Sequence, residues 1–322
     1  MIEEIMSNLY RIEIPLPETP LKSLNSYVIK EKGRNLIIDT GLNREECMNT
    51  MESGLKELGV DIRETDFFIT HLHSDHLGLV SSLATDRSAI YFNRPDADRM
   101  RAGISLDVLI DFARLNGFPE NELQTVSYSH PGFKFKPAGI PDFKILKEND
   151  TIRISGYVFH CIETPGHTWG HMCLYEPKKK ILVAGDHILG DITPNIQLWT
   201  DEWDPLRAYL ESLDKVNQFD IELVLPGHRG IFGNAKERIR ELKEHHQKRL
   251  EEILSILKNS TKNAFQIASE MTWDILCDSW DLFPAPQKWF ATGEAIAHLK
   301  YLEEKEMIRK EMLGQSIIYS LN

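Results

Sequence analysis

Four side chains of the kinds that bind metal ions occur within six residues, at His71, His73, Asp75 and His76. They directly follow the apolar run Phe67-Phe68-Ile69, which predicts a strand that stops at Thr70. Imidazole and carboxylate groups together suit zinc, iron or manganese. The sequence therefore predicts a metal site in a loop at the carboxyl end of this strand.

Three later segments repeat the same order of apolar strand, turn and metal-binding side chain, and they lead to His167, Asp186 and His228. If the strands lie side by side, their carboxyl ends form one rim where all seven groups can meet. Seven ligands exceed the needs of one tetrahedral ion, so the number predicts two metal ions with Asp186 bridging them. Such a site would be locally cationic and would suit an anionic group or a developing oxyanion.

In type and order these motifs resemble the metallo-β-lactamase superfamily of dinuclear hydrolases. The motif His-x-His-x-Asp-His at residues 71–76 is followed by Pro-Gly-His, Gly-Asp and a second Pro-Gly-His. The resemblance implies a four-layer αββα sandwich of α+β class and a metal-bridging hydroxide as nucleophile. It also implies two ligand sets and a bridging residue: His71, His73 and His167; Asp75, His76 and His228; and Asp186.

The metal ions implied are two divalent cations, with zinc expected first and iron or manganese as alternatives. True β-lactamases of the superfamily usually have Cys at the position of Asp186, and most secreted ones carry a signal peptide. This sequence has the carboxylate, and its first residues lack the basic and apolar regions of a signal peptide. It resembles instead the glyoxalase II, ribonuclease and lactonase branches.

Four residues are candidates for roles beyond metal binding. Asp75 and Asp186 are assigned catalytic roles, and Asp75 could also receive or pass a proton. Asp39 ends a predicted strand and, within the resemblance, would orient a ligand histidine; an ordinary turn residue is the alternative. His187 follows Asp186 directly and is a candidate general acid or substrate contact.

The elements that must position these groups follow from periodicity. Strands are predicted over residues 9–14, 26–30 and 35–39, and helices over residues 44–58 and 77–83. Residues 94–145 form an insertion in the catalytic domain, with helices over residues 97–102 and 106–115 and a loop-rich part over 119–141. We expect this insertion to act as a lid whose aromatic residues line the approach to the metals, or else pack the insertion onto the body of the domain. These aromatic residues are Phe112, Phe118, Tyr128, Phe133 and Phe135.

Residues 234–322 are predicted to form a second domain after a catalytic domain of residues 1–233. A helix over 235–257, a second capped by Ser260-Thr261 and a third through 289–302 precede strands over 307–312 and 316–321. Three helices and a hairpin predict a winged-helix-like unit, as in the superfamily branch related to lactamase-β-like protein 2. This stretch has 13 Lys+Arg against 14 Asp+Glu, so we expect packing or homodimerisation rather than nucleic-acid binding.

Composition narrows the class of protein. A chain of 322 residues that is 42% hydrophobic can bury one large core and a smaller appended one. No apolar run approaches the roughly 18 to 20 residues of a membrane span, and we expect a cytoplasmic protein without a membrane partner. The four cysteines lack paired spacing, which predicts buried thiols rather than disulfides.

Three functions remain at this stage. The first is hydrolysis of a thioester or another small carboxylic ester, with a small anionic or acyl molecule as substrate. The second is cleavage of single-stranded RNA by an endoribonuclease, which would require a cationic track that the net charge of −12 does not suggest. The third is a non-catalytic metal-binding regulator.

Overall fold

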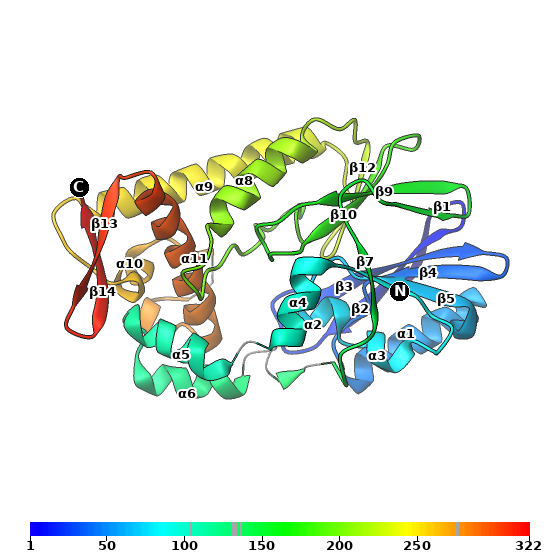
Figure 1. The fold of residues 1–322 in the computed structure, drawn as a ribbon, viewed down its shortest axis with the longest axis horizontal. Coiled ribbons are helices and arrows are strands. Elements are labelled where there is room, and N and C mark those ends of the chain that lie inside the picture. The colour runs from blue at the N-terminus through cyan, green and yellow to red at the C-terminus, as the bar shows by residue number, and fades with distance from the viewer. Residues whose placement is uncertain (104, 130–133, 136, 275–276) are drawn as a thin grey trace. The chain divides into compact units, whose positions relative to one another are not determined.

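The computed structural model describes residues 1–103, 105–129, 134–135, 137–274 and 277–322. The chain forms two compact units, each assembled from separate segments (Figure 1). The first contains Met1–Gly103, Phe135–Pro194 and Ser212–Ile239, and the second contains Ile104–Lys134, Asn195–Glu211 and Arg240–Asn322. Residues 104–134 of the expected insertion thus cluster with the carboxyl-terminal segment. The division at residues 233 and 234 stays a prediction.

The larger sheet of the first unit has seven strands, β1 to β7, in chain order. The first four strands pair antiparallel, and β4 to β7 pair in parallel. The three predicted amino-terminal strands are confirmed as β2, β3 and β4, whereas β1 was not predicted. The bounds of the seven strands are Ile2–Met6, Leu9–Leu16, Lys22–Glu31, Arg34–Ile38, Thr65–Phe68, Ile90–Asn93 and Phe143–Leu146.

The second sheet of this unit has five strands in the order β12-β11-β10-β9-β8. Neighbours from β8 to β11 are antiparallel, and β11 is parallel to β12. As a result β9, β11 and β12 run in the same direction and end at the same edge. Their bounds, from β8 to β12, are Thr151–Ile154, Tyr157–Glu163, Met172–Glu176, Ile181–Gly185 and Leu223–Pro226.

Two apolar cores hold the layers of the first unit together. One joins the facing surfaces of the two sheets and includes Ile29, Phe68, Phe159 and Leu174. The other joins the opposite face of the larger sheet to the helices that follow β4, β5 and β6. Both sheets therefore have apolar faces removed from water, which dominates the stability of such a fold. This confirms the predicted mixed α+β architecture.

The helices on the larger sheet are α1 (Glu45–Leu58), α2 (Ser74–Leu77), α3 (Val80–Leu83) and α4 (Arg94–Ala102), with a 3₁₀ turn over Ile62–Glu64. The prediction of one helix over residues 77–83 was wrong, because two short helices flank Gly78 and Leu79. A Cβ at Gly78 would lie 2.4 Å from the Ser74 carbonyl oxygen and 2.7 Å from that of Gly41. The chain therefore passes too close to other backbone for a side chain at this position.

The second unit contains helices and a terminal hairpin, and the predicted helix over residues 235–257 is confirmed with those bounds. The elements are α5 (Leu106–Leu115), α6 (Glu120–Ser129), the start of α8 (Pro205–Val216), most of α9 (Ala235–Leu257), α10 (Ala264–Glu270), a 3₁₀ turn (Trp280–Leu282), α11 (Ala285–Glu304), β13 (Ile308–Leu313) and β14 (Ser316–Leu321). Asn263, rather than Ser260-Thr261, caps α10, through a reciprocal capping box with Gln266. The winged-helix comparison stays a prediction.

In the second unit, α6 packs against α11, and α5 packs against α6 and β14. The expected loop-rich part contains α6, so that prediction was wrong at its start. Phe118 is buried, and its ring contacts those of Phe265 and Trp289. Among the other expected aromatics, Tyr128 is 83% exposed, and Phe133 lies outside the described residues. Phe118 thus packs within the second unit, whereas the expected alternative was packing on the body of the catalytic domain. In the described part of the chain, no helix has both the length and the apolarity of a membrane span.

Candidate metal centre

The seven predicted ligand side chains come together at the edge of the first unit where strands of both sheets end. The loop after β5 carries the first four, and the loops after β9, β11 and β12 carry the other three. The two sheets meet here directly, since the N–H of Met172 donates to the carbonyl of Thr70 over 2.9 Å. Parallel strand direction and this contact explain why residues that are distant in the sequence share one site.

The first group of ligand atoms consists of three imidazole nitrogens. His73 Nδ1 lies 3.0 Å from His71 Nε2 and 3.0 Å from His167 Nε2. A ring nitrogen either donates one hydrogen or accepts one, so Nδ1 cannot satisfy both neighbours at once. Nitrogens bound to one tetrahedral zinc lie at a comparable spacing, about 3.3 Å for bonds of about 2.0 Å. The triad is therefore explained better by a shared cation than by hydrogen bonds alone.

The second group contains Asp75, His76 and His228, whose ligand atoms lie within 4.8 Å of one another. Asp186 stands between the two groups: its Oδ1 is 3.5 Å from His76 Nε2, and its Oδ2 is 3.4 Å from His228 Nε2 and 3.6 Å from His167 Nε2. One carboxylate thus faces ligands of both groups, as the sequence predicted for a bridging residue.

Hydrogen bonds on the far side of the rings fix which nitrogen faces the centre. His76 Nδ1 donates to Asp39 Oδ2 over 2.8 Å, and His228 Nδ1 donates to the Ser23 carbonyl over 2.8 Å. Both Nε2 atoms are left without a hydrogen-bond partner among the described residues. Asp39 also accepts the N–H of Thr70 over 2.9 Å. The buried Asp39 therefore contacts the His76 ring on the side away from the centre, and its role in orienting a ligand stays a prediction.

Close packing around the centre leaves no room for a side chain at position 227. A Cβ at Gly227 would lie 2.5 Å from Asp186 Oδ1 and 2.8 Å from His76 Cε1. The Pro-Gly-His spacing before His228 thus has a steric reason. Asn25 holds this turn, since its side chain donates to the carbonyls of Pro226 and Arg229.

Comparison with known proteins identifies the fold. The sequence profile of the metallo-beta-lactamase superfamily matches residues 20–228. The chain belongs to this superfamily. It is accordingly a metal-dependent hydrolase, and the superfamily implies divalent metal ions at the clustered histidines and aspartates.

Individual members of the superfamily are similar over most of the chain. A beta-lactamase-like protein 2 homolog of Caenorhabditis elegans is 25% identical over 80% of this chain and 73% of its own length. An atrochrysone carboxyl ACP thioesterase of Emericella nidulans is 21% identical over 82% of this chain and 69% of its own. The crystal structure of a metallo-beta-lactamase family protein from Thermus thermophilus has a TM-score of 0.83 and 26% identity, covering 99% of this chain and 100% of its own.

The charges at the centre attract cations. Burial would raise the pKa of Asp186, but the neighbouring His228 and His76 hold it well below its usual range. Burial would lower the pKa of His228, but Asp186 and Asp75 raise it to about 10. By contrast, burial and neighbouring imidazoles lower the pKa of His73 to about 3. Divalent metals bind neutral imidazoles and ionised carboxylates, so His73 is already in the binding form, whereas a metal ion at His228 would displace the proton of its ring. The donor types, imidazole and carboxylate, fit the ions that the superfamily implies.

His187 lies inside the protein, next to the centre. Its side chain is fully buried, and burial lowers the pKa of the imidazole to about 3. The backbone N–H of His187 donates to the Ala184 carbonyl. A side chain enclosed in this way is neutral at physiological pH. A role as general acid or substrate contact stays a prediction.

Two residues near the centre were missed by the sequence reasoning. His171 Nε2 accepts the N–H of Asp186 over 3.1 Å, and Asp96 accepts hydrogen bonds from both loops of the first histidine triad. The position of His171, four residues after the predicted ligand His167, is a weak sequence signal for it. Nothing in the local sequence marks Asp96, whose partners are 24 to 74 residues away.

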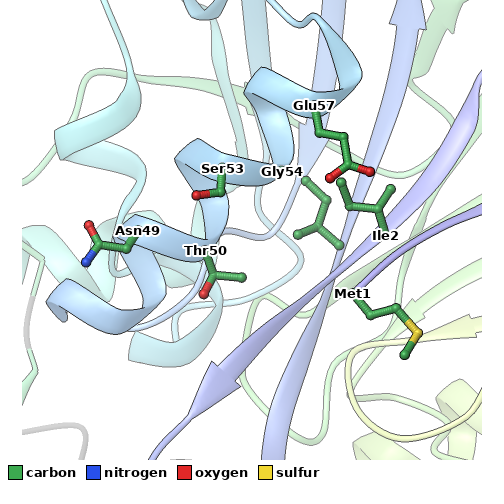
Figure 2. Close-up of a pocket in the computed structure, with 8 residues that line it drawn as sticks. Met1, Ile2, Asn49, Thr50, Ser53, Gly54 and Glu57 are labelled. Carbon is green, nitrogen blue, oxygen red and sulfur yellow. The ribbon is translucent and has the colours of Figure 1, made fainter.

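A separate pocket of about 350 Å³ lies between β1, β2 and α1 (Figure 2). Asn49, Thr50, Ser53 and Glu57 line it from α1, and Ile2 of β1 lines it together with the preceding Met1. None of its lining residues belongs to the ligand cluster, so it adds no group to the metal centre.

Proposed function

We propose that the protein hydrolyses a thioester or another small carboxylic ester at a centre of two divalent metal ions, zinc in the first instance. The observation that carries the proposal is the position of Asp186, whose two carboxylate oxygens face histidines of both ligand groups. One group would be His71, His73 and His167, and the other Asp75, His76 and His228. Bound divalent ions would supply a hydroxide nucleophile at neutral pH and would polarise the scissile carbonyl.

The residues of the chain contribute orientation and proton transfer. Asp39 and the Ser23 carbonyl hold His76 and His228 so that Nε2 faces the centre. The side chain of Asp75 is 18% exposed, and the adjacent His76 and His228 outweigh burial and hold its pKa below the usual range. An ionised, partly accessible carboxylate can accept a proton from an attacking water, so Asp75 is the proposed proton acceptor.

A carboxylic ester substrate is supported by a relative that is named as a thioesterase. The positive charge expected at the centre would favour the oxyanion formed when a carbonyl is attacked. The acidic composition of the chain, with a net charge of −12, supports a small substrate better than RNA.

The test measures metal and turnover on the same sample, purified without chelator. We expect about two zinc or iron ions per chain by plasma mass spectrometry, and turnover within a panel of acyl-thioesters. Asp186→Ala and His73→Ala should remove metal and activity together, because both delete a ligand. His160→Ala is the matched control, since His160 lies on β9 outside the ligand cluster.

A labelled single-stranded RNA in the same assay separates the alternatives. Cleavage of RNA without turnover of any ester would refute the proposed substrate class. Full metal content in Asp186→Ala or His73→Ala would refute the ligand assignment itself.

A further inference from the structure

Asp96 connects the two loops that carry the first histidine triad. It lies in the first turn of α4, after β6, and its side chain is fully buried. Its Oδ2 accepts the N–H of Leu72 over 2.9 Å and the hydroxyl of Thr168 over 2.8 Å. Its Oδ1 accepts the N–H of Gly170 over 2.7 Å.

Two of these donors are adjacent to proposed ligands, and the third, Gly170, lies three residues after His167. Leu72 separates His71 from His73, and Thr168 follows His167. A single carboxylate therefore fixes the backbone between two ligands of one loop and the residues next to the third ligand on another. All three partners donate, which suits an ionised carboxylate whose lone pairs are shared between two loops.

The contact with α4 is close and extends beyond the carboxylate. A Cβ at Gly170 would lie 2.6 Å from Asp96 N and 2.8 Å from Asp96 Cγ. The guanidinium of Arg99, on the same helix, lies over the Trp169 ring at 4.7 Å from its centroid. The loop that carries His167 is thus seated against α4, and this contact requires glycine at position 170.

We infer that Asp96 is a positioning residue that holds His71, His73 and His167 at metal-binding distance by tying their loops together. The inference rests on the proposed assignment of these histidines as ligands. Groups that orient ligands without touching the metal contribute typically about 10- to 100-fold to metal affinity. Asp39 contacts the ring of His76, whereas Asp96 contacts two backbone N–H groups and the Thr168 hydroxyl in the loops of the first triad. The effect of Asp96 should therefore fall on the first triad alone.

The test titrates chelator-stripped protein with Zn²⁺ in competition with a chromophoric chelator and resolves the two binding steps. In Asp96→Asn, the amide nitrogen must face at least one of the three donors, so one hydrogen bond is lost. We expect one of the two steps to weaken about 10- to 100-fold, with the other unchanged. The matched control is Asp98→Asn on the same helix, where an exposed carboxylate pairs with Arg101, and it should bind like the wild type.

A second pair of variants guards against misfolding of Asp96→Asn. Thr168→Val removes the hydroxyl that donates to Asp96, whereas Thr168→Ser retains it. We expect weakened binding in the first and wild-type binding in the second, with unchanged circular dichroism of the metal-free proteins. Equal Zn²⁺ affinity in Thr168→Val and Thr168→Ser, or equal weakening of both steps in a folded Asp96→Asn, would overturn the inference.

His73→Ala in the same titration separates this inference from the ligand assignment. Loss of one binding step in His73→Ala with no change in Asp96→Asn would overturn the role of Asp96 alone. Two intact steps in His73→Ala would instead overturn the assignment on which that role depends.

Discussion

At the scale of single residues, His171 lies outside the proposed ligand set but contacts Asp186, the proposed bridging ligand, and so can determine its position. Its Nε2 accepts the N–H of Asp186, and its Nδ1 lies 2.8 Å from the Thr164 hydroxyl. Burial holds the pKa of His171 well below its usual range, so the ring is neutral and can accept. We predict that His171→Phe leaves the N–H of Asp186 without a partner, lowering the free energy of unfolding by about 1–3 kcal/mol.

Urea unfolding of the metal-free protein measures this effect, because the lost hydrogen bond does not depend on bound metal. His160→Phe is the control, since it makes the same exchange on β9 at a partly exposed position. Equal free energies of unfolding in the two variants would contradict the role of His171.

The sequence predicted which histidines and aspartates cluster better than it predicted the residues that support them, for a physical reason. Metal-binding side chains must meet at strand ends, so they leave short motifs such as His-x-His-x-Asp-His. Asp96 and His171 act mainly through backbone N–H groups, which every residue except proline carries, and so they leave no such motif. Asp39 was predicted because it closes a strand beside the motif, whereas Asp96 lies beyond the next strand.

At the scale of elements, α9 and α11 enclose a histidine pair that makes the second unit sensitive to acid. His246 Nδ1 lies 3.0 Å from His298 Nε2, and both side chains are fully buried. Burial lowers the pKa of each of the two histidines. Glu294, Arg249 and His245 surround the pair. The unfolded state therefore binds more protons below a pH of about 6.5, and stability falls as the pH falls through this range.

Urea unfolding followed by tryptophan fluorescence suits this prediction, because Trp199 and Trp289 stack within the same unit. Each histidine adds up to about 1.4 kcal/mol per pH unit to the slope. We predict a shallower slope in His246→Phe than in the wild type at fixed metal content. His245→Phe, which changes the half-exposed neighbour, should keep the wild-type slope. A wild-type slope in His246→Phe would refute the assignment.

Helices were predicted correctly where the local sequence pattern favoured a helix, and they were missed where contacts with distant residues stabilise the helix. The long helix α9 has an apolar stripe along its whole length, and its bounds were predicted. The helix α6 was missed because its run of Asn, Gln, Thr and Ser favours turns, whereas in the structure Glu122 pairs with Lys288 of α11. That stabilising partner is 166 residues away and invisible to a local pattern.

At the scale of the whole molecule, all of the proposed ligands belong to the first unit, so metal removal should loosen the two units unequally. The second unit has its own buried core, in which Trp289, Ala295 and Leu299 of α11 take part, and contributes no residue to the ligand groups. Metal that binds the folded state stabilises it by about 4 kcal/mol at a concentration about 1,000 times its dissociation constant. Removal of the metal by a chelator therefore destabilises the loops that carry the proposed ligands.

We therefore predict that chelation speeds amide hydrogen exchange in the loops over residues 70–78, 164–172 and 226–230. Exchange in α10, α11 and the β13–β14 hairpin should change little, since these elements hold no ligand. Mass spectrometry of peptides from the stripped and the zinc-loaded protein measures both regions in one sample, so each serves as the control for the other. Faster exchange of equal size in both units would mean that metal stabilises the chain as one cooperative body. Unchanged exchange in the three loops would show that the ligands are held by protein contacts such as those of Asp39 and Asp96 even without metal.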